Sequence, residues 1–398
     1  MRVLFILTEL PYPASRNGIA LINHELLRRA PANAHIDLLI TGIEEPSEDI
    51  EQLRVLAPAI GQIEFTGEPL SRKYRVGNLL SGALFGRNLF TQRGVKCHLG
   101  NLDRLPDVIY VAPLMTGLDL DLAQPLFLNA VDSFARLNEN AYLRTGHWRN
   151  WLKMILYRLY ERRALSAANM INFVSSADLE GVRREAPELP LINISNGVDS
   201  SKFTPDESLR VPGRLLFTGN FDYGPNADAA RHLVVNVFPK IRSAIPSATL
   251  EIVGRNPPVE ILEQPGVIAT GFVEDITACY RTSQIFVCYL LSGAGVKNKV
   301  LEAMSSGLPV VTTQLGVEGI DYLEAGKHYL LANDTHTFVN CVLNILENEE
   351  VRTSLAQEAR ATTSKHHSWA PIIERYFTAL RLVADNRKQV EARRATMH

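Results

Sequence analysis

The sequence contains few of the features that mark metal-binding, disulfide-stabilised or nucleic-acid-binding proteins. Its four cysteines are scattered over 398 residues without a CxxC pair. This spacing argues against a zinc site or a disulfide framework and is typical of a protein from a reducing cytoplasm. The net charge of −2 argues against a protein that binds nucleic acid mainly by electrostatic attraction. We therefore expect no metal, no nucleic-acid partner and a cytoplasmic location.

Long hydrophobic segments and repeats are also missing. The apolar run at the start ends at Thr8-Glu9, which makes it too short for a signal peptide or a membrane span. No short-period repeat and no low-complexity tract interrupts the chain. The composition, with 46% hydrophobic and 21% charged residues, is that of a soluble globular protein, and the length suits two domains of about 200 residues each.

Short apolar runs alternate with helical spacers along the whole chain. Runs of this length that are apolar throughout are typical of strands buried on both faces of a parallel sheet. The alternation predicts an α/β protein with doubly wound domains. One long helix is expected through Phe238 and Ile245. The expected strands span residues 2–7, 36–41, 63–66, 108–112, 126–130 and 171–174 in the first half, and 214–219, 250–254, 285–291, 309–311 and 329–331 in the second.

One glycine loop organises the second half of the chain. A short apolar strand is followed by Gly293 and Gly295, and a helix is expected to begin near Lys297. Such a loop binds anions, because its free N–H groups and the helix dipole both favour negative charge. Lys299 adds a second cation, and Glu302 lies three residues further, on nearly the same helix face. These groups suit a ligand with phosphates at one end and hydroxyls at the other.

This stretch, read as GxGxKxKxLEAMxxGxPVVxT, resembles the signature of family 4 glycosyltransferases. That family has the GT-B fold and uses nucleotide sugars. Its Glu-x7-Glu pair brackets the loop, and the second Glu holds the nucleotide ribose; Glu302 matches it. The first Glu falls at Ala294, so the usual carboxylate contact with the donor sugar is missing from the pattern. The simpler alternative is a βαβ unit whose glycines only make a tight turn.

Two other strings extend the resemblance. Residues 191–199 end in a string that looks like the family's IxNGVD, which marks the passage into the second domain. The family's diphosphate-binding Arg and Lys are absent from the loop after Gly219, where Asn220 replaces the Arg. A subgroup of exopolysaccharide-type sugar transferases with the string GxxDYxPNxDA has the same substitution. We expect Lys297 and Lys299 to hold the diphosphate instead, together with loop amides.

The second domain contains four further candidates. For Asp222 and Asn226, turn or cap formation and substrate contact are equally expected. Arg255 is expected to flank the base or ribose. Val273 belongs to a segment whose backbone usually reads the base in the resembled family.

The first domain contributes two candidates. Gly18 matches a glycine that packs against the diphosphate in the family, with a simple turn glycine as the alternative. Asp132 occupies the neighbourhood of a family histidine that faces the donor sugar and acceptor. Its carboxylate would accept a proton or bond the acceptor hydroxyl, or else cap the next helix.

The predicted sites can be collected in two sets. The donor-binding set is Gly18, Gly219, Asn220, Arg255, Val273, Gly293, Ala294, Gly295, Val296, Lys297, Lys299 and Glu302. The catalytic set is Asp132, Lys299 and Glu302.

Two basic segments with interleaved apolar residues cover residues 70–104 and 148–163. Basic amphipathic helices can lie on anionic membranes, and members of the resembled family often take lipid-linked or membrane acceptors. Peripheral contact with the inner membrane face is therefore one interpretation. The other, which the composition favours, is that these helices cover a sheet and extend their charges into solvent.

The resemblance implies the following architecture and activity. The fold would be GT-B, with two Rossmann-like doubly wound domains facing a central cleft: residues 1–195 on the acceptor side, 196–368 for the nucleotide sugar, and 369–398 as a helix that crosses back. The reaction would be retaining transfer of a sugar from a UDP- or GDP-linked donor to an unidentified acceptor hydroxyl, without a cofactor, in polysaccharide or glycoconjugate synthesis. The alternatives are a nucleotide-sugar epimerase of the same fold and a non-catalytic nucleotide-sugar-binding subunit.

Overall fold

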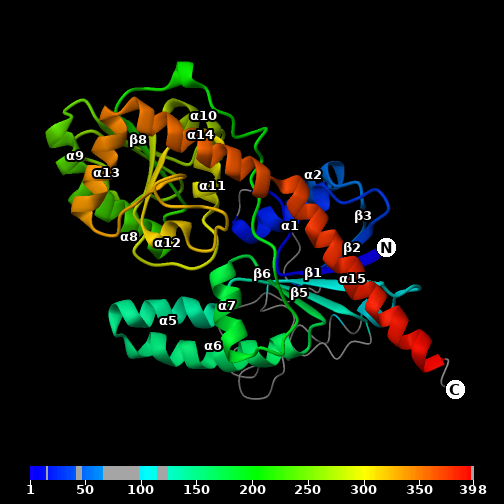
Figure 1. Ribbon diagram of the computed structural model, residues 1–398. Helices are drawn as coiled ribbons and strands as arrows, with labels where there is room; N and C mark the ends of the chain where they lie inside the picture. Colours follow the sequence, from blue (N-terminus) through cyan, green and yellow to red (C-terminus); the bar gives the residue numbers. More distant parts are fainter. Residues whose placement is uncertain (15–16, 42–46, 66–94, 96–97, 114–123, 396–398) are drawn as a thin grey trace. The chain divides into compact units, whose positions relative to one another are not determined.

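The chain divides into two compact units. The computed structural model describes residues 1–14, 17–41, 47–65, 95, 98–113 and 124–395 (Figure 1), so most of the predicted basic segment 70–104 lies outside the described residues. The first unit comprises Met1–Ser195 together with Ala370–His398, and the second comprises Asn196–Trp369. Each unit is built on its own parallel sheet.

Within the described residues, the sheet of the first unit has seven strands in the order β3-β2-β1-β4-β5-β6-β7. The strands are β1 (Arg2–Leu7), β2 (His35–Ile40), β3 (Ile60–Phe65), β4 (Val108–Ala112), β5 (Leu126–Val131), β6 (Met170–Phe173) and β7 (Leu191–Asn193). The predicted runs are confirmed with ends that differ by at most one residue, except that β3 begins three residues earlier. As an edge strand β3 alternates between covered and exposed residues, so only part of it reads as an apolar run.

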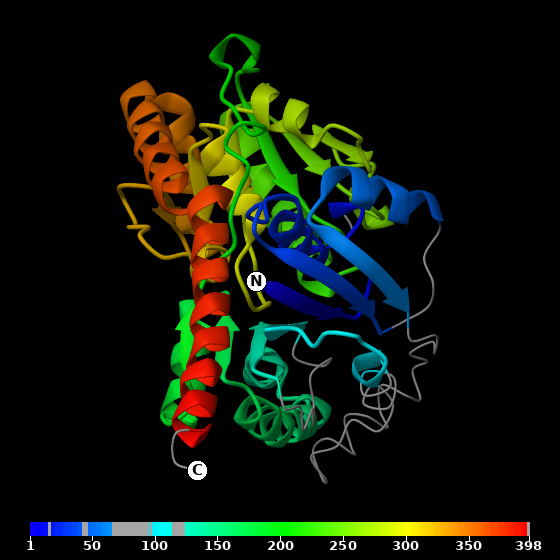
Figure 2. The ribbon, with the colours of Figure 1, turned by 90° about the vertical axis from the view of Figure 1, so that its right-hand side faces the viewer.

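Helices cover this sheet, and the last helix of the chain belongs to the same unit. They are α1 (Gly18–Arg28), α2 (Ser47–Leu56), α5 (Phe134–Thr145), α6 (Trp148–Ser166), α7 (Ser176–Glu185) and α15 (Trp369–Ala395). Figure 2 shows α15 in red as one long helix. It is attached to the sheet by Tyr376, whose hydroxyl accepts a hydrogen bond from Asn172 on β6 at 2.9 Å. Arg375 donates to the backbone carbonyl of Asn193 on β7 at 2.6 Å.

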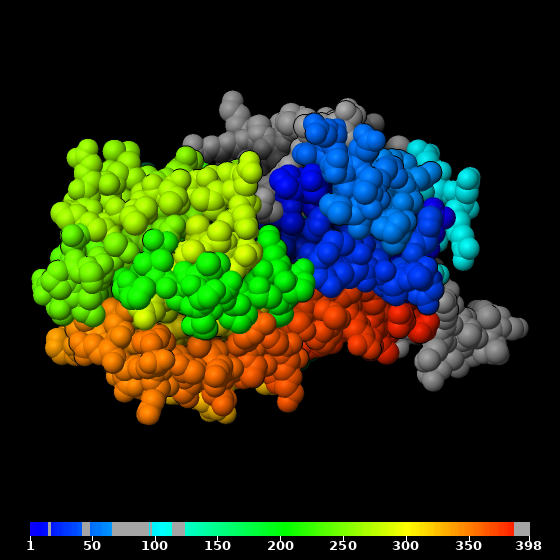
Figure 3. Space-filling model, turned by 90° about the horizontal axis from the view of Figure 1, so that it is seen from above, coloured from blue at the N-terminus to red at the C-terminus, as the bar shows by residue number. Residues whose placement is uncertain are grey.

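The sheet of the second unit has six strands in the order β10-β9-β8-β11-β12-β13. The strands are β8 (Arg214–Thr218), β9 (Thr249–Val253), β10 (Val267–Gly271), β11 (Ile285–Cys288), β12 (Val310–Thr312) and β13 (Leu330–Leu331). The helices are α8 (Gly224–His232), α9 (Phe238–Ala244), α10 (Ile276–Thr282), α11 (Asn298–Ser305), α12 (Gln314–Val317), α13 (Thr335–Glu347) and α14 (Glu349–His366), with short helical turns at Glu207–Leu209 and Val259–Ile261. In the space-filling view, α13 and α14 (orange) form a continuous outer surface of this unit (Figure 3).

Two strands of this sheet differ from the predicted runs. Strand β11 ends at Cys288, three residues before the end of its apolar run, because the chain there turns into the glycine loop. Strand β10 was not among the expected strands. It lies at the edge of the sheet and alternates between half-buried and exposed residues, so it does not read as an apolar run.

A widened helical turn, Leu233–Val237, joins α8 to α9. The sequence predicts one long helix here. Pro239 has no N–H to donate and its ring crowds the preceding turn, so a regular α-helix cannot pass through it unchanged. The chain responds with a π-type hydrogen bond from the N–H of Phe238 to the carbonyl of Leu233.

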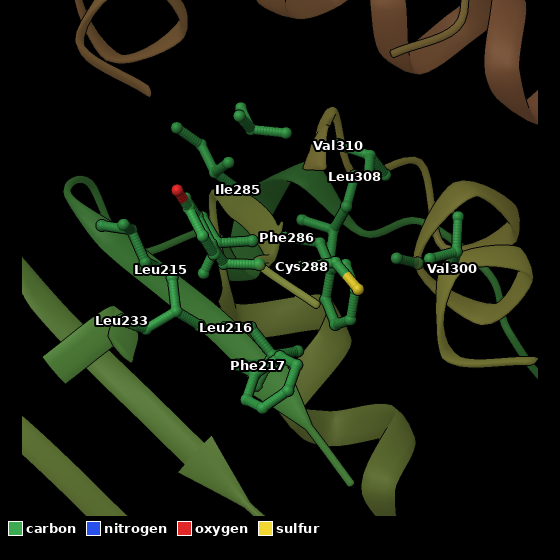
Figure 4. Packing of buried hydrophobic residues seen from close by; sticks show 14 of the residues in the cluster. Leu215, Leu216, Phe217, Leu233, Ile285, Phe286, Cys288, Val300, Leu308 and Val310 are labelled. Carbon is green, nitrogen blue, oxygen red and sulfur yellow. The ribbon is translucent and has the colours of Figure 1, made fainter. Parts of the chain in front are cut away.

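The core of the second unit lies between β8, β11 and α11 (Figure 4). Phe217, Phe286 and Val300 are fully buried there. Burial of each such side chain contributes roughly 1.5–3 kcal/mol. Helix α11 ends in a C-terminal capping motif. Gly307 has a φ of 68°, a conformation that glycine adopts most readily, and its N–H donates to the carbonyl of Met304. Packing on one face and this cap at one end fix the position of α11.

The two strand orders have the same consequence for ligand binding. In each sheet the first strand of the unit lies between the second and the fourth, so the chain changes direction between β1 and β4 and between β8 and β11. Ligands of doubly wound proteins bind beyond the carboxyl ends of the strands at such a switch point. In the second unit, the loops that follow β8 and β11 therefore form the expected site.

Candidate functional site

The glycine loop after β11 leads directly into the N-terminus of α11. Gly293 and Gly295 have φ values of 132° and 69°, which side-chain-bearing residues rarely adopt. Ala294 and Val296 alternate with these glycines and are partly covered. Lys297 is the N-cap residue of α11, and its side chain makes no capping hydrogen bond. Because the first N–H groups of a helix have no partner within the helix, this end of α11 is suited to an anion.

The two predicted lysines differ in their contacts. The ammonium group of Lys297 is buried and donates to the carbonyl of Gly295 within the loop. Lys299 Nζ donates to the side-chain oxygen of Asn226 at 2.7 Å and lies 4.5 Å from the centroid of the Phe217 ring. Burial is the main cause that lowers the pKa of Lys299 to about 8, and the neighbouring charge of Lys297 acts in the same direction. A nearby diphosphate would favour the charged form of both lysines.

Glu302 is held by a tyrosine that the sequence does not reveal. Tyr280 on α10 donates its hydroxyl hydrogen to Glu302 Oε2 at 2.9 Å. A second contact joins the Tyr280 hydroxyl to Thr218 Oγ1 at 2.9 Å, and Thr218 must be the donor there because the tyrosine has a single hydrogen to give. Burial raises the pKa of Glu302, whereas the hydrogen bond from Tyr280 lowers it. Nothing in the linear pattern links Tyr280 to Glu302; only the packing of α10 beside β8 joins them.

The loop after β8 forms the other side of this site. A Cβ atom on Gly219 would lie 2.9 Å from Cγ of Asn226 and 3.1 Å from Nζ of Lys299, so glycine leaves room for that pair. The backbone carbonyl of Asn220 accepts from the Asn226 side chain at 2.8 Å, which orients its oxygen toward Lys299. Asn226 thus makes a contact that neither a turn nor a helix cap requires. Asp222, in contrast, accepts hydrogen bonds from Asn256.

Arg255 and Val273 follow the next two strands of the sheet. The guanidinium of Arg255 lies 4.9 Å from the ring centroid of Phe272, and both side chains are exposed. This stacked pair offers a flat, partly apolar surface beside the carboxyl end of β9. Val273 packs against the core of the unit. The two residues follow β9 and β10, on one side of β8, whereas the lysines follow β11 on its other side.

The IxNGVD string has a direct structural connection to α11. The side chain of Asn196 donates to Oδ1 of Asn298, the first residue of the helix, at 2.8 Å. Gly197 packs against Trp369, where an added Cβ would come within 2.6 Å of the indole. The string therefore helps to hold the N-terminus of α11 in place.

Gly18 and Asp132 belong to the first unit. Gly18 is the exposed first residue of α1, after the carboxyl end of β1, and Asn17 caps that helix by accepting from the N–H of Ala20 at 2.8 Å. Asp132 follows β5 directly. The strands that precede these two residues, β1 and β5, are separated in the sheet by β4.

The backbone that carries Asp132 is strained. Val131 has a φ of 67°, an unfavourable value for a β-branched residue, and the N–H of Asp132 donates to the carbonyl of Ala130 at 3.0 Å. Strained backbone of this kind gathers at functional sites. The N-cap of α5 is Ser133, whose hydroxyl accepts from the N–H of Arg136 at 3.2 Å. The capping role considered for Asp132 is therefore filled by its neighbour.

A buried carboxyl group supports this turn. Glu161 on α6 is 4% exposed and accepts hydrogen bonds from the Ser133 hydroxyl at 2.9 Å and from the N–H of Ala135 at 3.0 Å. Burial raises the pKa of Glu161 to about 7 despite these hydrogen bonds. Asp178 on α7, also buried, accepts from Arg136 at 3.0 Å. Neither acid stands out in the sequence, because each reads as an ordinary helical residue.

Two further predictions concern metals and membranes. Within the described part of the chain, no group of three or more His, Cys, Asp or Glu side chains is arranged to hold a metal ion. Two histidines, His366 and His367, are adjacent in the sequence. The ring of His366 stacks on Tyr322, and His367 contacts the carbonyl of Asp321 at 3.0 Å. Over the same described residues, every helix is too short or too polar to cross a bilayer.

Comparison with known proteins identifies relatives of both units. Residues 212–348 match the family model described as glycosyl transferases group 1. An uncharacterized 44.6 kDa protein in the cps region of Klebsiella pneumoniae is 22% identical over 364 residues, covering 87% of this chain and 91% of that protein. A phosphatidyl-myo-inositol mannosyltransferase of Mycolicibacterium smegmatis is 24% identical over 230 residues, covering 54% of this chain and 57% of the enzyme.

Among solved structures, the Anabaena protein HepE in complex with UDP and glucose has the same fold. The TM-score is 0.67 at 14% identity, with 95% of this chain and 99% of that chain covered. The signature around Glu302 and the family match over residues 212–348 relate the second unit to the glycosyl transferases of group 1, and the two parallel-sheet units have the GT-B fold.

Proposed function

We propose that the protein transfers a sugar, with retention of anomeric configuration, from a nucleoside-diphosphate sugar to an acceptor hydroxyl. The observation that carries this proposal is the grouping of Lys297, Lys299 and Glu302 at the N-terminus of α11, beside the switch point of the second sheet. UDP-linked donors are favoured over GDP-linked donors, because the similar protein HepE binds UDP and glucose.

The donor diphosphate would lie against the N–H groups of the glycine loop, with Lys299 and Lys297 supplying positive charge. Glu302, oriented by Tyr280, would accept hydrogen bonds from the ribose hydroxyls. During transfer the bond between the anomeric carbon and the diphosphate oxygen breaks, and its electron pair leaves with the nucleotide. Preorganised cations and amides stabilise the charge that develops on that oxygen. This arrangement supplies the electrostatic stabilisation without a metal ion.

On the acceptor side, a new bond forms between the anomeric carbon and the acceptor oxygen, whose proton must be removed. Asp132 is proposed to hydrogen-bond that hydroxyl or accept its proton. The similar Klebsiella protein in a cps region favours a role in polysaccharide or glycoconjugate synthesis. We propose the cytoplasm as the place of this reaction.

The first experiment is a thermal-shift panel of UDP-, GDP- and ADP-sugars, since a ligand that binds the folded state raises the melting temperature. The stabilising donor is then incubated with polysaccharide precursors, and the anomeric configuration of the product is read by NMR. Sugar transfer with retention supports the proposal. Appearance of an epimer without acceptor identifies an epimerase, and tight donor binding without transfer or hydrolysis for any acceptor identifies a binding subunit.

A further inference from the structure

Helices α5 and α6 form an antiparallel hairpin whose turn lies away from the sheet of the first unit (Figure 1). The chain reverses at Gly146, which has a φ of 64°, and at His147, which caps α6. One face of α6 is buried, through Met154, Tyr160 and Glu161. A helix that only covers a sheet would be polar on its other face.

The outer face of α6 is instead apolar. Trp151 and Leu152 lie three and four residues after Trp148, which is helical spacing, and Leu159 continues the stripe two turns later. Trp148 is 62% exposed, Trp151 47%, Leu152 42% and Leu159 45%. Leu143, in the last turn of α5, is 75% exposed and adds to the apolar tip. Isolated exposed apolar residues are common in proteins, but five gathered on one hairpin mark a contact surface.

The charged residues at the tip of the hairpin have one sign. From Asn140 to Tyr160 the sequence contains no Asp or Glu, and Arg144, Arg149 and Lys153 lie near the turn. Further along α6, Arg158 forms ion pairs with Glu139 and Glu185 and is not part of the tip. Arg149 and Lys153 are exposed at the tip, and the guanidinium of Arg149 lies 5.8 Å from the ring centroid of Trp148. The chain as a whole has a net charge of −2, so this excess of cations is local.

We propose that the tip of the α5–α6 hairpin, residues 143–153, binds the surface of a membrane rich in anionic lipids. Tryptophan rings prefer the interface between headgroups and acyl chains, where the ring is covered and its N–H stays hydrated. Lysine and arginine beside them meet the lipid phosphates. The combination of exposed tryptophan and cations without acids fits this partner better than it fits a second copy of the chain, which would place like charges together. The interpretation of segment 148–163 as a simple cover for the sheet does not account for the exposed tip.

The test is flotation of the full-length protein with vesicles of phosphatidylcholine alone and of phosphatidylcholine with about 30% phosphatidylglycerol. We expect binding to the anionic vesicles only, weakened by high salt because the electrostatic part is screened. Replacing Arg149 and Lys153 by alanine should lower the partition coefficient by about fivefold for each cation. Trp148→Ser with Trp151→Ser should lower it further and should remove the blue shift of tryptophan fluorescence on binding.

The matched control is Val55→Ser with Arg184→Ala, which changes one exposed apolar residue and one exposed cation elsewhere on the same unit. This control should bind vesicles as the wild type does. Circular dichroism melts verify that the exposed substitutions leave the fold intact. Equal binding to neutral and anionic vesicles, unchanged binding of the tip variants, or a concentration-dependent dimer that the tryptophan variants abolish would overturn the proposal. None of these measurements depends on sugar transfer, so the result stands apart from the proposed reaction.

Discussion

Lys299 donates a hydrogen bond to Asn226 at 2.7 Å, across 73 residues of sequence. The first residue belongs to α11 and the second to the start of α8, so this contact joins the two loops that flank the switch point of the second sheet. Asn226 is neutral and leaves the positive charge of Lys299 uncompensated by an acid at that contact. The pair therefore holds an ammonium group in position while keeping its charge available for an anionic ligand.

Removing this ammonium group should weaken donor binding strongly. A hydrogen bond to a charged group contributes about 1.5–3 kcal/mol, so Lys299→Ala should raise the Kd for UDP by about 10- to 100-fold. Isothermal titration calorimetry measures the change. Lys240→Ala, which removes an exposed lysine from α9, is the control and should bind UDP normally. An unchanged Kd for Lys299→Ala would place the diphosphate elsewhere.

Donor binding should depend on pH through the same residue. Burial places the pKa of Lys299 at about 8 in the free protein. As pH rises through about 8 the ammonium group loses its proton, and the affinity for UDP should fall. Lys299→Arg keeps its charge at every pH used, because a guanidinium does not deprotonate in this range. Titrations between about pH 6.5 and 9.5 should therefore show a steeper loss for the wild type than for the arginine variant; parallel curves would contradict this assignment.

Glu302 should recognise the sugar part of the nucleotide and not its phosphates. Glu302→Gln replaces a charged acceptor by a neutral one of the same size, and the Kd for UDP should rise by about tenfold, as for loss of one charged hydrogen bond. The Kd for inorganic pyrophosphate should stay the same, because that ligand has no ribose. Equal weakening of both ligands would mean that Glu302 acts through the shape of the loop.

Tyr280→Phe tests whether the hydroxyl between Thr218 and Glu302 orients the carboxylate. The ring remains, so packing is conserved, but Glu302 loses its donor at 2.9 Å. We expect a stability loss of about 1 kcal/mol and a several-fold higher Kd for UDP, again without effect on pyrophosphate. Thermal melts and calorimetry together separate the two contributions. A variant that melts earlier but binds UDP as before would restrict Tyr280 to a structural role.

The stability of the protein should depend on pH through Glu161. Burial raises its pKa from the ordinary value of 4.5 to about 7 in the folded chain. Between these values the unfolded chain releases a proton that the folded chain keeps, so this residue lowers stability as pH rises from about 4.5 to about 7. The full effect is about 3 kcal/mol, because each tenfold difference in proton affinity between the two states corresponds to about 1.4 kcal/mol.

Glu161→Gln should remove this part of the pH dependence, and the exposed Glu188→Gln should not. Calorimetric melts at about pH 5 and about pH 7.5 make the comparison. If the wild type and Glu161→Gln lose stability equally over this range, the carboxyl group of Glu161 is ionised throughout.

Much of this molecule follows from local sequence patterns. Buried strands of a parallel sheet read as continuous apolar runs, so the predicted ends of β1 and β4 are the observed ones. The glycine loop and the start of α11 at Asn298 are equally readable, because positive φ angles and helix capping depend on a few neighbouring residues. The edge strand β3 and the widened turn before α9 are less readable. Partial exposure of a strand depends on its place in the sheet, and the effect of the Pro239 ring depends on how the preceding turn packs.

The contacts of the candidate site were decided by tertiary structure alone. The sequence predicted the α/β class and the glycine loop from local patterns. It also predicted the cluster of cations and a carboxylate at the start of α11, because those residues are close along one helix. It did not determine that Asn226 holds Lys299, that Tyr280 orients Glu302 or that Glu161 lies beneath the turn before α5. Those contacts join segments far apart in the chain, and a side chain's partner across a fold is set by how sheets and helices pack, which no local pattern of residues encodes.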